Sequence, residues 1–421
     1  MHGDLTTAAA LAVFAATYIL ISLQKIRFLN LDRPSAALAG GLLMVLFGIV
    51  PFSKAVREAI NWETIALLFG MMVVVAYLKR ARFFEYVSTW ILLRAGTPSR
   101  LLALLVPTSG LLSALFVNDT ICLLFTPIVL GALLKARRNP VPYLIALVTS
   151  ANIGSVMTLT GNPQNMLVGM FSGISYGRFL LLMLPVGAAG LWLDWAILRR
   201  LYRGEFEGGF DPGPLALPRV HGAVIRRVLA ILALMTAGFL LPVERWVPAL
   251  GEGHKLPLLA LAGAAAVILV GRYPPAAAFQ YVDWTLLVFF AGLFVVIAGV
   301  NAAGILPEIH RRAAPLFDEH GAVLCAFTVV LSNIVSNVPF ILVAQGWASG
   351  DYAWLLIAMA STFAGNLTIV GSVANMIVLE LSRERAPIGF WAYLRAGVPV
   401  TLASTAAGFA ILAGLRALGA L

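Results

Sequence analysis

Long apolar segments follow one another along the chain, separated by short polar stretches that carry most of the charges. A transmembrane helix needs about 20 mostly apolar residues. The segments that we predict to span a bilayer are ten: 5–24, 35–52, 62–78, 142–171, 179–198, 224–241, 256–270, 284–300, 352–379 and 390–415. Two more, 101–134 and 322–346, are interrupted by polar residues near their middles. We predict that these two are re-entrant hairpins, and that the chain is an all-α membrane protein.

Composition supports this class. Hydrophobic residues make up 61% of the 421 residues and charged residues 11%, whereas soluble domains carry about 25% charged residues. This excludes a soluble enzyme or binding module, and membrane lipid is an expected partner. The first apolar run lacks a basic region before it and a small-residue cleavage site after it, which favours a span over a signal peptide.

Motifs for cofactors and nucleotides are missing from the sequence. The two cysteines and five histidines form no cluster with metal-ligand spacing, so neither a metal nor another cofactor is expected. No G-x-x-x-x-G-K-[ST] motif occurs either. The energy for any transport is therefore expected from an ion gradient, with a separate ATPase partner as the alternative.

The net charge of +10 is distributed unevenly along the predicted path. Of the 29 Lys and Arg residues, 21 fall on one side, among them Lys25, Arg27, Arg33 and those of segments 79–100 and 199–227, and 8 fall on the other. Cytoplasmic loops are enriched in Lys and Arg. We therefore predict that the basic side is cytoplasmic, that both termini lie on the non-cytoplasmic side, and that nucleic acid is not a partner.

The two halves of the chain resemble each other. NWETIALLFGMMVVVA at 61–76 aligns with DWTLLVFFAGLFVVIA at 283–298, LTGNPQNMLV at 159–168 with IVGSVANMIV at 369–378, and FVND at 116–119 with IVSN at 334–337. Each half would hold five spans and one hairpin, and because five is odd, the second half would be inverted. We divide the chain into a first repeat (1–203), a cytoplasmic linker (204–221) and a second repeat (222–421). Inverted repeats are typical of secondary transporters.

Polar residues inside the apolar segments gather at the two hairpin tips and in two broken spans, around TLTGNPQN (158–165) and GNLTIVGSVAN (365–375). Irregular backbone at membrane depth is tolerated only where it is buried in protein or lines a cavity. A broken helix would leave carbonyls free to hold a cation and amides free to hold an anion or a hydroxyl. Four matching clusters favour one shared site over simple helix packing. The predicted substrate-binding residues are Asn118, Thr120, Asn152, Thr160, Gly161, Asn162, Asn165, Asn333, Asn337, Gly365, Asn366, Thr368, Gly371, Ser372 and Asn375.

Asp119 alone among the nineteen acidic residues is predicted deep in the membrane. An intramembrane ionisable residue is a functional hypothesis by default, so we expect Asp119 to bind the coupling ion, H⁺ or alternatively Na⁺. A structural, protonated carboxyl is the other interpretation. Asp194 lies near Arg199, can pair with it, and is expected to be structural. Cys122 is a candidate soft ligand for a solute such as As(III), although a Cys in an apolar helix is more often a packing residue.

The motif FVNDTICLLFTPIVL resembles the A-N-D-x-x-x-x-x-x-T-P-I signature of arsenite pumps, and LSNIVSNVPFILV resembles their second hairpin tip. Over nearly its whole length the chain is thus similar to the ion transporter superfamily. Within it, the likeness is to the arsenite-efflux and Na⁺/H⁺ antiporter group (ArsB and NhaD type), with plant silicon-efflux and melanosomal P-protein relatives. The resemblance implies about ten spans in two inverted repeats, each with a re-entrant hairpin and a broken helix. TGNPQN and VGSVAN are also similar to loops of citrate and dicarboxylate carriers, but neither contains their S-N-T.

The resemblance implies an inner-membrane antiporter that extrudes arsenite or antimonite from the cytoplasm in exchange for protons. No basic residue is predicted near the site, so a multiply charged anion would lack a counter-charge. A small neutral hydroxylated solute suits the Asn, Ser and Thr lining better. The alternatives are a Na⁺/H⁺ antiporter, a Na⁺-coupled carrier of carboxylates or inorganic anions, a silicic acid transporter, and a channel built from the same parts.

Overall fold

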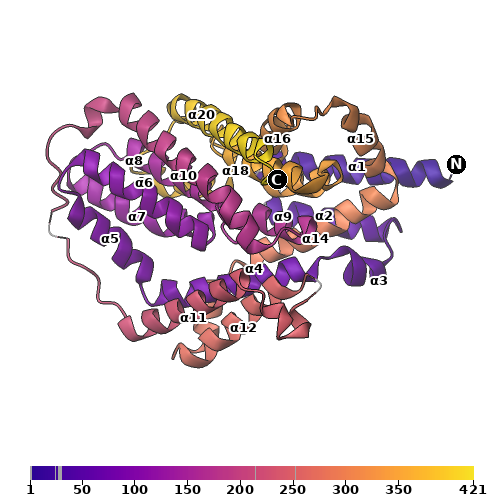
Figure 1. Ribbon diagram of the computed structural model, residues 1–421, viewed down its shortest axis with the longest axis horizontal. Helices are drawn as coiled ribbons and strands as arrows, with labels where there is room; N and C mark the ends of the chain where they lie inside the picture. Colours follow the sequence, from indigo (N-terminus) through magenta and orange to yellow (C-terminus); the bar gives the residue numbers. More distant parts are fainter. Residues whose placement is uncertain (1, 24, 27–30, 214, 252) are drawn as a thin grey trace.

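The computed structural model describes residues 2–23, 25–26, 31–213, 215–251 and 253–421, which are almost entirely helical (Figure 1). Arg27, one of the residues in the charge comparison, lies outside the described residues. Eight of the described helices are long and apolar enough to cross a membrane by length and composition, and several shorter apolar helices accompany them. The all-α prediction is thus confirmed, with one small departure. Strands β1 (Lys25–Ile26) and β2 (Leu31–Asp32) pair in an antiparallel ribbon between the first two helices.

The first half of the chain contains, in order, α1 (His2–Leu23), α2 (Arg33–Leu46), α3 (Phe52–Lys54), the π-helix η1 (Ala55–Ala59), α4 (Trp62–Arg80), α5 (Phe83–Ala95), α6 (Pro98–Leu115), α7 (Asn118–Lys135), α8 (Val141–Ser155), α9 (Pro163–Ser172), α10 (Tyr176–Leu201) and the short 3₁₀ helix η2 (Arg203–Phe206). One prediction needs correction here, because the predicted span 35–52 ends at Leu46. The basic segment 79–100 contains a helix that was not predicted, α5. Phe84, Ile91 and Leu92 of α5 are buried, while Trp90 and Leu93 are exposed.

The second half contains α11 (Gly222–Leu240), η3 (Val243–Arg245), η4 (Pro248–Leu250), α12 (Lys255–Val270), α13 (Pro275–Phe279), α14 (Trp284–Ala302), α15 (Ile305–Ala313), η5 (Ala314–Leu316), α16 (Ala322–Val335), α17 (Asn337–Ala344), η6 (Gln345–Trp347), α18 (Gly350–Ala364), α19 (Val373–Ser382) and α20 (Phe390–Ala417). In Figure 1 the hairpin α6–α7 and α8 lie at the left, α15 and α16 lie at the right, and α11 and α12 lie along the bottom.

Corresponding helices of the two halves follow in the same order, and three pairs match in length. Helices α4 and α14 each have 19 residues, α8 and α18 each have 15, and α9 and α19 each have 10. The packing matches too: α6 packs on α8 as α16 packs on α18, and α4 packs on α12 as α14 packs on α2. These packing pairs therefore correspond between the halves, as the repeat in the sequence indicates. The opposite orientation of the halves in a membrane and the exact division of the chain stay predictions.

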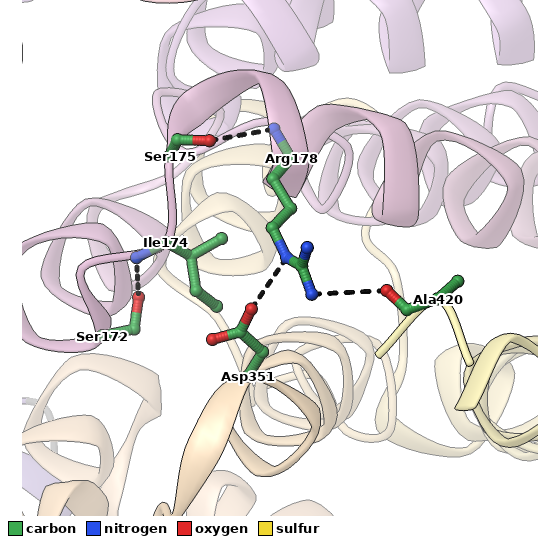
Figure 2. A network of polar contacts seen from close by, with 6 residues as sticks. All are labelled: Ser172, Ile174, Ser175, Arg178, Asp351 and Ala420. Atoms are coloured by element: carbon green, nitrogen blue, oxygen red, sulfur yellow. Dashed lines mark hydrogen bonds and ion pairs between the residues drawn. The ribbon is translucent and has the colours of Figure 1, made fainter.

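Contacts between loops agree with the predicted path. Lys79 lies over the ring of Tyr281, and Arg227 donates a hydrogen bond to the Val270 carbonyl at 3.1 Å, so segments assigned to the basic side meet one another. On the other side, Figure 2 shows Arg178 at the start of α10 bound to Asp351 at the start of α18, with 2.8 Å between Nε and Oδ2. Arg178 also donates to the Ala420 carbonyl at 3.3 Å. This exposed pair ties the two halves together at that end.

Candidate functional site

A cavity of about 250 Å³ lies where the two hairpin tips meet the starts of α9 and α19. Tip 1 comprises residues 116–119 and tip 2 comprises residues 335–338. Six helices begin at the cavity wall: α2, α7, α9, α14, α17 and α19. A helix N-terminus carries a partial positive charge and free amides, so this wall suits anions and hydroxyl oxygens. The lining residues are Asp32, Arg33, Pro34, Asn118, Asp119, Pro163, Gln164, Asp283, Thr285, Leu286, Phe289, Ser336, Asn337, Val338, Ser372 and Val373.

The two helix breaks are built in the same way. Asn162 caps α9 by accepting a hydrogen bond from the Asn165 amide at 2.8 Å, and Ser372 caps α19 by accepting from the Asn375 amide at 3.1 Å. Across each break an asparagine side chain ties down the end of the preceding helix. Asn165 donates to the carbonyls of residues 155 and 158 at 3.1 and 3.0 Å, and Asn375 donates to those of residues 365 and 368 at 2.7 and 2.8 Å. The carbonyls that we expected to be free for a cation therefore already accept hydrogen bonds.

Glycines allow the backbone to fold back at each break. A side chain at Gly161 would collide with the backbone of Ser155, and one at Gly371 would collide with Asn333 and with the carbonyl of Gly365. The Gly161 carbonyl accepts a hydrogen bond from the Asn118 amide at 3.2 Å, so tip 1 ends beside the break. Since that break lies between the two halves of a predicted span, the tip reaches the same depth, as the hairpin prediction requires.

Asn152 of α8 joins the segments behind the cavity. Its side-chain carbonyl accepts from Asn118 at 2.8 Å. Its amide donates to Asn366 at 2.8 Å, and to Ser372 and Asn375 at 3.1 Å each. All five side chains are at least nine-tenths buried. The structure thus brings both halves together through one buried amide cluster, because each of these polar groups needs a partner away from water.

Only part of the predicted substrate-binding set lines the cavity: Asn118, Asn337 and Ser372, together with Asp119. The other buried asparagines, Asn152, Asn162, Asn165, Asn366 and Asn375, lie behind the wall and hold it in place. The physical reason is that an amide at a helix break first satisfies the backbone groups that the break leaves without partners.

The remaining predicted positions fall elsewhere. Thr160 bonds the Tyr176 hydroxyl at 3.1 Å, and Thr368 donates to Asn333 at 2.9 Å on the far side of the second break. Gly365 forms part of that break. Thr120 lines a smaller second cavity. Cys122 is completely buried one turn along α7 from Asp119 and is absent from the cavity lining, so its part as a ligand stays a hypothesis.

Asp119 is half-buried in the first turn of α7 and faces the cavity. The backbone amide of Ala374, in the first turn of α19, lies close to its carboxylate. The other two carboxylates of the lining cap their own helices: Asp32 accepts from the Ser35 amide at 3.0 Å, and Asp283 accepts from the Leu286 amide at 3.0 Å. Asp119, on tip 1, therefore lies against the start of α19, whereas Asp32 and Asp283 each cap the helix that they precede.

The prediction that no basic residue lies near the site is wrong. Arg33 lines the cavity, and its charge and that of Asp283 both act on Asp119. Both residues start helices at the ends of predicted spans, where hydropathy places them in loops. The packing of α2 against α14 brings these two helix starts beside tip 1. The sequence did contain a signal, because D-R-P-S at 32–35 is a helix-start pattern, with Asp as cap and Pro in the first turn.

A second cavity of about 100 Å³ shares Asp119 and Asp283 with the first and extends to Lys79 and Tyr281. Lys79 belongs to the predicted cytoplasmic side. Asp119 therefore lies between the main cavity and a smaller cavity that reaches Lys79. Tip 2 shows a different feature: Ser336 has φ 78° and ψ 150°, a conformation that is otherwise almost limited to glycine and costs about 1–3 kcal/mol.

Asp194 contradicts two expectations. It is completely buried in α10, so Asp119 is not the only carboxyl inside the membrane part. It also forms no ion pair with Arg199, whose guanidinium lies 5.1 Å from the centre of the Trp195 ring. Arg199 points toward that ring on the partly exposed face of the helix, whereas Asp194 points inward.

Apolar helices in two matching sets, broken helices, and a central cavity lined by helix starts define a multi-pass membrane transporter. The sequence profile of the citrate transporter family (CitMHS) matches residues 18–364, and the chain belongs to this family. The family is part of the ion transporter superfamily, which confirms the resemblance seen in the motifs.

Named relatives and one solved structure agree with this assignment. An uncharacterized transporter of Mycobacterium tuberculosis is 32% identical over 94% of this chain and 96% of its own length. The silicon efflux transporter LSI3 of Oryza sativa is 31% identical over 95% and 96%, and a putative transporter arsB of Dictyostelium discoideum is 26% identical over 93% and 89%. The YdaH transporter of Alcanivorax borkumensis has a similar fold, with a TM-score of 0.63 and 15% identity over 99% and 98% of the two chains.

Proposed function

We propose that this transporter extrudes a small, neutral, hydroxylated inorganic solute, arsenite or antimonite, from the cytoplasm across the cell (inner) membrane in exchange for protons. The observation that carries the proposal is the lining of the main cavity. Side-chain amides, hydroxyls and helix starts converge on about 250 Å³, which is below the roughly 300–1,000 Å³ typical of pockets for drug-sized ligands. Three hydroxyl groups on one small centre can both donate to and accept from such a wall.

Charge supports the same choice. Three carboxylates, Asp32, Asp119 and Asp283, line the cavity with a single cation, Arg33. A trivalent anion such as citrate would meet more negative than positive side chains in this cavity, and this charge distribution disfavours its binding. One relative is named a silicon efflux transporter and another a putative transporter arsB, and these names add support to the proposal. Silicic acid is the nearest variant of the proposal.

In this proposal Asp119 exchanges the coupling proton, because it belongs to tip 1, faces the cavity and lies against the start of α19. Sodium coupling has less support, since Asn165 and Asn375 already donate to the carbonyls that would hold Na⁺. The main cavity and the smaller cavity adjoin Arg33 and Lys79, so the solute would enter from the basic, cytoplasmic side.

A second candidate is a carboxylate carrier, and Arg33 is the observation that favours it. A guanidinium recognises a carboxylate through two parallel hydrogen bonds, and the six helix starts would add partial positive charge. Under this alternative the three acidic residues would have to be neutralised by protons or by a cation bound with the substrate.

Proteoliposomes containing the purified protein separate these candidates. With an acidic lumen, we expect arsenite to accumulate inside against its own gradient, to do so without Na⁺, and to leak out when a protonophore collapses the pH gradient. Antimonite, silicic acid, citrate and ²²Na⁺ are measured in parallel, with protein-free vesicles and Asp119→Asn as controls. Accumulation of citrate, or exchange of Na⁺ without arsenite, would contradict the proposal, and arsenite movement without accumulation would identify a channel.

A further inference from the structure

Asp194 lies in the middle of the helical core, away from the cavity lining. It is completely buried, and among the described residues no group makes a hydrogen bond of normal geometry to either of its carboxyl oxygens. The Thr149 hydroxyl of α8 faces the carboxyl, and Tyr393 of α20 lies near enough for the charges of the two groups to interact. A buried polar group without a partner is costly, so this position calls for an explanation beyond helix packing.

The hydrogen of the Thr149 hydroxyl is already used. Thr149 donates to the Ile145 carbonyl at 2.8 Å, which leaves its oxygen only as an acceptor. A carboxylate beside it would therefore meet an oxygen lone pair, whereas a neutral carboxylic acid can donate its own hydrogen to that oxygen. Tyr393, whose hydroxyl also lacks a partner, can then donate to the second carboxyl oxygen.

Charged groups around Asp194 offer no alternative. No basic side chain among the described residues forms an ion pair with it, and Arg199 on the same helix is engaged with Trp195. The titratable groups that face this region are Tyr393 from α20 and, beside Tyr393, Cys122 from α7. Neither can supply a positive charge. An unpaired carboxylate would be expensive here, and a neutral acid would not.

A chain of hydrogen bonds leads from Thr149 to the cavity. The Thr149 backbone carbonyl accepts from Asn366 at 3.1 Å, Asn366 accepts from Asn152 at 2.8 Å, and Asn152 accepts from Asn118 at 2.8 Å. Asn118 lines the cavity beside Asp119. Tyr393 also faces Asn375, a second member of the same cluster. Asp194 thus lies at the inner end of the amide cluster that forms the cavity wall.

We propose that Asp194 is a positioning residue held as a neutral carboxylic acid, which donates to Thr149, accepts from Tyr393 and orients the amide cluster that braces the wall of the solute cavity. This inference rests on the proposed function, and it assigns different roles to the two membrane-embedded carboxyl groups. Asp119 exchanges the coupling proton, and Asp194 keeps its proton throughout the cycle. The second repeat has Gly408 at the matching place, so this support is present in the first repeat alone.

Infrared spectroscopy tests the protonation state without any transport. The difference spectrum between the wild-type protein and Asp194→Asn in lipid should show loss of one carboxylic acid C=O band, unchanged between pH 5 and pH 9. Loss of a carboxylate band instead would overturn the proposal. Because this measurement needs no arsenite, it stands even if the wild-type protein moves another solute.

Transport kinetics test the positioning. Asp194→Asn retains a donor and an acceptor, so we expect KM for arsenite and the pH profile to stay within about twofold of wild type. Asp194→Leu, or Thr149→Val if the leucine variant does not fold, should raise KM about tenfold through loss of a buried hydrogen bond while the pH profile is kept. A pH profile altered by Asp194→Asn in the way that Asp119→Asn alters it would refute the assignment. Wild-type vesicles that move no arsenite would refute the proposed function alone.

Discussion

Tip 1 presents Asn118 and Asp119 to the cavity, whereas tip 2 presents Ser336 and Asn337 at the matching positions. The surroundings differ as well. Tip 1 lies beside Arg33 and Asp283, while Asn337 of tip 2 accepts a hydrogen bond from Ser332 of its own hairpin at 2.9 Å. Tip 1 thus combines the ionisable group with charged neighbours, and tip 2 supplies neutral polar groups on a strained turn. The two tips therefore occupy matching positions, but the first half supplies the ionisable group and the second half supplies neutral polar groups.

The counterparts of the charged neighbours show the same division. Arg33 corresponds to Lys255 and Asp283 to Asn61, at equal spacing in the two halves. Lys255 lines a cavity of about 360 Å³ with Glu63 and Glu244, which contains the end of α9 and neither hairpin tip. Lys255 pairs with Glu244 at 3.0 Å. In this structure the two tips face the helix starts of α2 and α14, and those of α4 and α12 are turned to a separate cavity.

The strongest test of this comparison exchanges the two tip residues. Asp119→Asn makes tip 1 as neutral as tip 2, and we expect pH-driven arsenite accumulation to fall by at least about 100-fold, as for loss of an essential proton-carrying group. Adding Asn337→Asp to that variant should not restore accumulation, because the charges of Arg33 and Asp283 act on the position of Asp119. Accumulation in proteoliposomes is the measurement, and full activity in Asp119→Asn would remove this residue from coupling.

The asparagines that bridge the two breaks provide the next comparison. Asn375 ties down its break and also accepts a hydrogen bond from Asn152. Asn165 ties down its break and accepts from Thr362 at 3.5 Å instead. We expect Asn375→Ala and Asn165→Ala each to destabilise the fold by about 2–3 kcal/mol, at about 1 kcal/mol per buried hydrogen bond. Thermal unfolding in detergent measures this.

The two variants should differ in transport. Asn375→Ala is expected to raise KM for arsenite more than Asn165→Ala does, because only Asn375 connects its break to the cluster behind Asn118. Asn375→Gln and Asn165→Gln are the matched controls that keep an amide with altered reach. Equal KM values for the two alanine variants would show that the amide cluster does not shape the site.

Much of the fold could be predicted from the sequence, because long apolar segments indicate membrane helices and clusters of polar residues within them indicate breaks. The Gly161-Asn162-Pro163 run and the polar run from Gly365 marked both breaks correctly. Helices α5 and α15 were missed because their length and charge resemble a loop in a hydropathy reading. Their apolar faces can be recognised as buried only once the positions of the helices that they pack against are known.

The site could be predicted less completely. Sequence spacing placed Asn152 and Asn375 near the site but could not tell a residue that faces the cavity from one that braces its wall. Arg33 and Asp283 stand at span ends, and only the tertiary packing of α2 on α14 carries them to tip 1. The residues missed by sequence are thus those whose position depends on contacts between the halves.

Substituting Arg33 and Lys255, which occupy corresponding positions, tests the difference between the two halves with a smaller expected effect on transport. Arg33→Gln removes the cation nearest to Asp119, and we expect the initial rate of arsenite transport to fall about fivefold, less than for loss of Asp119 itself. Lys255→Gln is the matched control and should change the rate by less than about twofold, because exposed ion pairs contribute little. Equal losses in the two variants would mean that both helix starts act on the solute during the cycle.

The smallest expected effect is on thermal stability, and it is measured by comparing substitutions in helices α15 and α5. Glu308 of α15 binds Arg311 at 2.6 Å and Arg312 at 2.5 Å, and these hydrogen bonds lower its pKa to about 2 from the usual 4.5. A carboxyl whose pKa is lower in the folded state stabilises the fold above the unfolded value and loses this contribution as pH falls toward 2. Glu308→Gln should therefore lower Tm slightly at pH 7, and the difference from wild type should shrink at pH 3. Glu85→Gln in α5, where the carboxylate meets only Arg82, is the control and should have the smaller effect at pH 7, because a single exposed pair contributes less than a bridged one.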